Sequence, residues 1–117
     1  MAGTITISTL SDGTNSTSAT NPIRGSAKAW VNFNGSGGAV NASYNVSSIT
    51  VSGTGQYIIN MTNALEDTSY SFLGFCTDNS LSRGSAINST SAFSMQCTNG
   101  VGTALVNPTN VFAAAFR

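Results

Sequence analysis

The chain has 117 residues, no net charge, no histidine and only 7% charged residues, against about 25% in ordinary globular chains. This length supports one domain with one modest core, and the neutral balance excludes the basic patch that nucleic-acid binding needs. No apolar run approaches the ~20 residues of a membrane span, so we expect neither nucleic acid nor a membrane as a partner.

The N-terminal residues 1–22 are predicted to form a strand followed by a polar arm. Residues 4–10 alternate, with Ile5 and Ile7 on one side and threonine and serine on the other, which indicates a strand. Residues 11–22 are too polar to bury and are predicted to be a loop or an extended arm. The start of the chain lacks the charged and apolar regions of a signal peptide, so we expect synthesis in a cytoplasm.

Residues 23–117 are predicted to form a single all-β domain. Clusters of Gly, Asn, Ser and Thr recur about every ten residues between short β-favouring runs, which is typical of a sandwich or barrel. We expect seven or eight short antiparallel strands in a compact sandwich, either jelly-roll-like or Ig-like. The predicted strands cover residues 27–33, 42–52 with a kink near Asn45, 56–61, 70–76, 91–97 and 110–116.

The connections between these strands are also predicted. Residues 53–55, Gly-Thr-Gly, are expected to form a hairpin turn, because glycine adopts the positive φ that tight hairpins need. Residues 64–67 are predicted to make one helical turn. Residues 70–76 form the most apolar run and are predicted to be a central strand, whereas residues 77–90 and 98–107 are expected to be polar loops. Pro108 is expected just before the last strand, where its missing N–H costs little.

The run from residue 27 to residue 33 carries the only tryptophan. Its alternation turns the odd-numbered residues toward the core and leaves Lys28, Trp30 and Asn32 on the opposite face. An aromatic residue on such a face packs in a subunit interface more often than it binds a ligand, and a near-zero net charge favours association. We therefore predict that these three residues lie at a subunit interface, with a ligand contact or simple partial exposure of Trp30 as the alternatives.

No catalytic, metal or cofactor site is predicted. Without histidine, neither a Ser-His-Asp nor a Cys-His arrangement can form. Glu66 and Asp67 are adjacent, whereas a glycosidase needs two carboxylates about 5–10 Å apart across a cleft. Asp78 has no second carboxylate nearby to hold calcium, and the chain has no Cys-x-x-Cys pair for zinc. We therefore expect a protein that is not an enzyme.

Cys76 and Cys97 lie in two different predicted strands. They are expected to form one disulfide or to remain as two buried thiols. Because the sequence encodes no secretory route, the thiols are favoured.

Residues 25–71 resemble a known family. The runs KAWVNFNG and NVSSIT and the ordered pattern GTGQY…N…TNAL.D..Y carry the resemblance, and residues 10–21 resemble the linker that precedes such modules. The family is that of C-terminal modules of bacteriophage tail-fibre proteins, common in phages of marine bacteria and cyanobacteria. The resemblance implies a virion structural protein, usually trimeric, with a role in host recognition or virion assembly. Residues 77–117 match only in general character.

Family members usually follow a long fibre shaft, whereas here the module begins close to Met1. That departure points to a short fibre tip, a knob on the capsid, or a small fibre attached to another virion protein.

We therefore predict a homotrimeric virion protein on the tail fibre or the capsid surface, made in the host cytoplasm. The leading role is a receptor-binding adhesin, in which neutral polar loops hydrogen-bond a host surface glycan. The alternatives are a capsid decoration (cement or knob) protein, whose partners are other virion proteins, and a small glycan depolymerase. The candidate receptor-facing residues are Asp78, Asn79, Arg83, Asn88 and Asn99.

Overall fold

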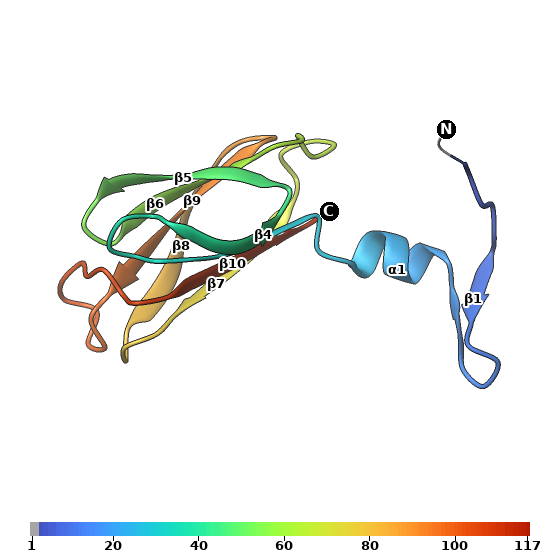
Figure 1. Cartoon of the computed structure of the whole chain (residues 1–117), viewed down its shortest axis with the longest axis horizontal. Helices are drawn as coiled ribbons and strands as arrows, with labels where there is room; N and C mark the ends of the chain where they lie inside the picture. Colours follow the sequence, from blue (N-terminus) through green and yellow to red (C-terminus); the bar gives the residue numbers. More distant parts are fainter. Residues whose placement is uncertain (1–2) are drawn as a thin grey trace.

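The computed structural model describes residues 3–117 and contains a sandwich of two four-stranded sheets (Figure 1). The sandwich strands are β3 Ala29–Phe33, β4 Val40–Tyr44, β5 Val46–Gly53, β6 Gln56–Met61, β7 Ser71–Cys76, β8 Leu81–Ser89, β9 Ala92–Thr98 and β10 Val111–Phe116. One sheet has the order β4-β3-β10-β7 and the other β5-β6-β9-β8, and all pairs are antiparallel. The predicted all-β sandwich is confirmed.

An N-terminal arm extends away from one end of the sandwich (Figure 1). It contains the short hairpin of β1 Thr9–Ser11 and β2 Ser16–Ser18, followed by α1 Thr20–Gly25. The prediction of a strand over residues 4–10 is wrong for residues 4–8, because pairing begins only at Thr9 and the earlier residues have no neighbouring strand. The boundary predicted between residues 22 and 23 falls inside α1.

The core lies between the two sheets and follows the predicted alternation. In β3, Ala29, Val31 and Phe33 are buried, and β6 and β9 bury every second residue in the same way. Phe33 meets the ring of Tyr57 edge-on, with centroids 5.1 Å apart. Burial of such side chains on the inner faces drives the two sheets together.

Asn45 confirms the predicted kink and carries the chain from one sheet to the other. Its φ is +54°, a left-handed conformation that asparagine tolerates better than most residues. Its Nδ2 donates to the carbonyl oxygens of Lys28 at 3.0 Å and Asn63 at 3.1 Å, and its Oδ1 accepts from the Asn63 N–H at 2.7 Å. These bonds fix the corner between β4 and β5.

Three predictions for the second half of the chain are wrong. The apolar strand β7 lies at a sheet edge and pairs only with β10, so it is not central. Residues 64–67 are irregular and form no helical turn, and most of the predicted loop over residues 77–90 is the strand β8. The hairpin turn at residues 53–55 and the place of Pro108 before β10 are confirmed.

Candidate functional site

The outer face of the sheet β4-β3-β10-β7 is apolar. Residues directly opposite one another in antiparallel strands share a face. The registers therefore align two rows of outward side chains across the four strands. The rows are Tyr44–Trp30–Ala114–Leu73 and Ala42–Asn32–Phe112–Phe75. We call this surface the apolar face.

Its large side chains are exposed in the single chain. Trp30 is 42% exposed and Phe75 63%, and Tyr44, Leu73 and Phe112 are also exposed. A sheet face of this composition is typical of a surface that another protein covers. Trp30 and Asn32 lie on this face as the alternation predicts. Lys28 lies at its border, where its Nζ donates to the Ser26 Oγ at 3.1 Å and to the Ile23 carbonyl oxygen.

The outer face of the sheet β5-β6-β9-β8 is mostly polar. One of its rows, Gln56–Gln96–Arg83, places two amides beside a guanidinium. The next row mixes the hydroxyls of Thr50 and Ser94 with the apolar Ile58. Asn60 adds an amide, whose Nδ2 donates to the Thr50 Oγ1 at 3.0 Å. The two outer faces of one sandwich therefore differ sharply in chemistry.

Loops of polar sequence lie at the end of the sandwich opposite the arm, which Figure 1 shows. A Cβ placed on Gly100 would lie 2.7 Å from the Asn79 carbonyl oxygen, so the turn at residues 77–80 packs against the loop that begins at Asn99. Asn99 shapes its own loop, because its Oδ1 accepts from the Thr103 N–H at 2.9 Å. We call these two loops the distal loops.

The carboxylate of Asp78 also makes a hydrogen bond that stabilises the fold. Its Oδ2 accepts from the N–H of Thr109, and this bond lowers the pKa of the carboxyl below its ordinary value. Asp78 and Asn79 both have positive φ, at +65° and +54°, as tight turns require.

The structure brings four of the five predicted receptor-facing residues toward one end and leaves one apart. Asp78, Asn79 and Asn99 lie in the distal loops, and Arg83 follows within a few residues along β8. Asn88 lies near the other end of β8, where its Oδ1 accepts from the Ser94 hydroxyl at 2.8 Å. Arg83 and Asn88 belong to a strand and not to a loop, which corrects the prediction for both.

Gln56 and Gln96 were not singled out by sequence reasoning. The signal was present, since the alternation of residues 91–97 turns Gln96 away from the core. Only the pairing of β8 with β9 shows that Arg83 lies opposite it. No hydrogen bond within the described residues uses the side chains of this row, in which Arg83 is exposed and Gln56 and Gln96 are half-buried.

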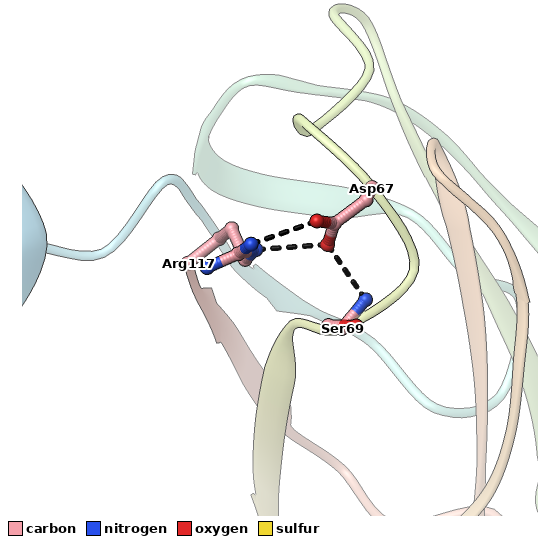
Figure 2. Close-up of polar contacts among 3 residues, drawn as sticks. All are labelled: Asp67, Ser69 and Arg117. Atoms are coloured by element: carbon pink, nitrogen blue, oxygen red, sulfur yellow. Dashed lines mark hydrogen bonds and ion pairs between the residues drawn. The ribbon is translucent and has the colours of Figure 1, made fainter.

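Arg117 and Asp67 form the one ion pair found among the described residues (Figure 2). The Arg117 Nε and Nη2 donate to the two carboxylate oxygens at 2.8 and 2.7 Å, and the Ser69 N–H donates to Oδ1 at 2.8 Å. The pair ties the end of β10 to the loop before β7. Hydrogen bonds from Arg117 and Ser69 lower the pKa of Asp67 to about 2.

Replacing Asp67 with asparagine is expected to remove a part of the acid sensitivity. A carboxyl whose pKa is lowered in the folded protein stabilises it above the unfolded pKa, near 4. That stabilisation is lost as the pH falls from about 4 to about 2. The Asp67→Asn variant should therefore be less stable than the wild type at pH 7, and its unfolding free energy should fall less between pH 5 and pH 2.

Urea denaturation at a series of pH values measures this difference. Glu66→Gln is the matched control, because it removes the neighbouring charge and keeps the bidentate pair. Equal acid slopes for the wild type and Asp67→Asn would contradict the role given to the pair.

The two cysteines are free thiols in the structure. Cys97 is fully buried on β9, and burial, together with the interaction of its thiol with the neighbouring Cys76, raises its pKa to about 12. A thiol with such a pKa stays protonated and unreactive at neutral pH.

Comparison with family models, with curated proteins and with solved structures found no match to this chain. Within residues 3–117, no cluster of three or more His, Cys, Asp or Glu side chains is placed to hold a metal ion. Among the described residues, no helix has the length and the apolar character of a membrane span.

Proposed function

We propose that the protein is a bacteriophage virion protein that acts as a homotrimeric receptor-binding adhesin for a host surface glycan. The observation that carries this proposal is the placement of polar groups at the end opposite the arm. The distal loops and the row Gln56–Gln96–Arg83 offer amides, hydroxyls and one guanidinium, with almost no competing charge. The resemblance of residues 25–71 to tail-fibre modules supports the same role.

The chemistry suits a glycan. Sugar hydroxyls both donate and accept hydrogen bonds, and amide side chains do the same without leaving a charge unpaired. Arg83 adds a planar donor that also pairs with the carboxylate of an acidic sugar. Each such site binds weakly alone, and three copies held together raise the avidity.

A second candidate function is capsid decoration. The protruding arm favours it, because an arm with exposed apolar residues is suited to binding neighbouring protein subunits. Glycan cleavage has less support, because Asp12, Glu66, Asp67 and Asp78 offer no pair across a cleft.

Binding of the purified protein to a panel of bacterial cells and to their isolated surface polysaccharides tests the proposal. Arg83→Ala should weaken binding by about tenfold or more, the loss expected for a charge-assisted hydrogen bond. Arg24→Ala is the matched control, since it removes an exposed arginine from α1 in the arm. Unchanged binding by Arg83→Ala would contradict the site.

Other outcomes would select the alternatives. Saturable binding to phage capsids stripped of this protein, with no binding to cells or polysaccharide, would establish decoration. Release of reducing sugar ends from the polysaccharide would overturn the non-enzymatic role.

A further inference from the structure

We propose that the arm of one copy covers the apolar face of a neighbouring copy, so that the chains assemble by exchanging arms. This inference rests on the self-association in the proposed function, and it is independent of the proposed ligand. In this assembly, the arm and the apolar face of one copy are each covered by a neighbouring copy.

The first observation is the arm itself. Its residues Ile5, Ile7, Leu10 and Ile23 are exposed, and Ile5 reaches 87%. With Ala19 and Pro22 they line an apolar groove of about 430 Å³. An exposed apolar groove of this kind is typical of a surface that binds a second apolar surface.

The second observation is where the arm points. It leaves the sandwich beside the end of β10, where the Lys28 N–H donates to the Ala115 carbonyl oxygen at 2.8 Å, and it extends away from its own sheets (Figure 1). The hydrogen bonds of Lys28 to Ser26 and Ile23 hold the root of the arm in this direction. The groove is therefore presented to another molecule and not to its own apolar face.

The third observation is the surface area. A compact chain of 11.9 kDa exposes about 5,900 Å², whereas this chain exposes 6842 Å². The excess of about 900 Å² is close to the ~800 Å² that one partner contributes to a standard interface. The radius of gyration, 16.6 Å, likewise exceeds the ~13 Å of a compact chain of this length.

The two surfaces match in chemistry. The arm is concave and aliphatic, while the apolar face presents the protruding rings of Trp30, Tyr44 and Phe75. Neither surface carries a charged side chain at its centre, so docking leaves no charge buried without a partner. A head-to-tail exchange of this kind closes into a ring when the rotation permits, and a trimer is such a ring.

Sedimentation velocity of the full chain over nanomolar to micromolar concentrations tests the assembly. Phe75→Ser on the face and Ile7→Ser on the arm should each raise the concentration of half-dissociation at least tenfold. Val101→Ser is the matched control for assembly, because Val101 is an exposed apolar residue far from the arm, and its substitution should leave the concentration of half-dissociation unchanged. Circular dichroism and thermal melting of each dilute variant confirm that the sandwich remains folded.

Cross-linking identifies the contact. Chains with Ile7→Cys, mixed with chains with Leu73→Cys, should form a mixed disulfide under mild oxidation, whereas Val101→Cys chains should not. Cross-linking of Leu73→Cys chains only to one another, unaffected by Ile7→Ser, would overturn the proposal in favour of face-to-face packing. A stable monomer at micromolar concentration would overturn it outright. Loss of glycan binding with intact arm exchange would contradict the adhesin role alone.

Discussion

Replacing Phe93 with alanine is expected to lower the free energy of unfolding by about 3–5 kcal/mol. Phe93 is fully buried in β9, where its ring stacks on Phe72 with centroids 4.6 Å apart and meets Tyr70 edge-on at 6.3 Å. Phe72 comes from the other sheet, so the substitution opens a cavity between the two layers. Single domains are stable by only about 5–15 kcal/mol, so the variant should be close to unfolding. Urea denaturation followed by circular dichroism measures the loss.

Phe75→Ala is the matched comparison for this result. It truncates the same ring on the outer face of β7, where Phe75 is largely exposed. In a dilute, monomeric sample it should change stability by no more than about 0.5 kcal/mol. A large loss from Phe75→Ala and a small one from Phe93→Ala would reverse the assignment of inner and outer faces.

Much of the fold could be predicted because alternation is a local signal. In β3, β6 and β9 every second residue is buried, and apolar residues mark those positions in the sequence. The corner at Asn45 was also predictable, since the β-favouring run is interrupted there by a residue that tolerates positive φ.

The strand β8 lacks that signal. It is an edge strand, and most of its residues are exposed on both faces. Its place is determined by backbone pairing with β9 and by contacts such as the Ser82 hydroxyl donating to the Gly74 carbonyl oxygen. The composition of this polar run is that of a loop, and only its pairing with β9 makes it a strand. This explains the wrong prediction for residues 77–90.

The wrong prediction for β7 arose because this edge strand is apolar on both faces, and this property bears on function. A strand apolar on both faces is typical of the middle of a sheet covered on both sides. In β7 the residues Phe72 and Cys76 face the core, while Leu73 and Phe75 face outward at the sheet edge. The proposed exchange of arms offers an explanation for the second apolar face, because it predicts that another copy of the chain covers this face.

The candidate site could be predicted only in part. Alternation alone placed Trp30 on an outer face. That Tyr44, Leu73 and Phe112 share that face depends on the order β4-β3-β10-β7, which joins strands far apart in the sequence. The row of Gln56, Gln96 and Arg83 depends in the same way on long-range pairing, which no local pattern encodes.

Replacing Gly55 with alanine is expected to cost about 3 kcal/mol or more of stability, because two effects combine there. Gly55 has a φ of +63°, which strains any residue with a Cβ by about 1–2 kcal/mol. The added Cβ would also overlap the Cys97 carbonyl oxygen and lie 2.6 Å from that of Val106. Both atoms belong to backbone held by the Cys97 N–H to Gly55 bond at 2.8 Å and the Val106 N–H to Cys97 bond at 3.1 Å, so neither can move without breaking a hydrogen bond.

Gly102→Ala separates the two effects. Gly102 has a similar φ of +74°, but a Cβ there would meet only the Leu81 Cδ1 at an ordinary 3.8 Å. This variant should lose only the ~1–2 kcal/mol of backbone strain, so the difference between the two alanine variants measures the clash. Since the Gly55 turn and residues 104–107 lie beside the distal loops, Gly55→Ala should also weaken the proposed glycan binding at temperatures where the sandwich is still folded. Equal losses from the two variants in thermal denaturation would show that the close packing of the turn against Cys97 and Val106 is not present.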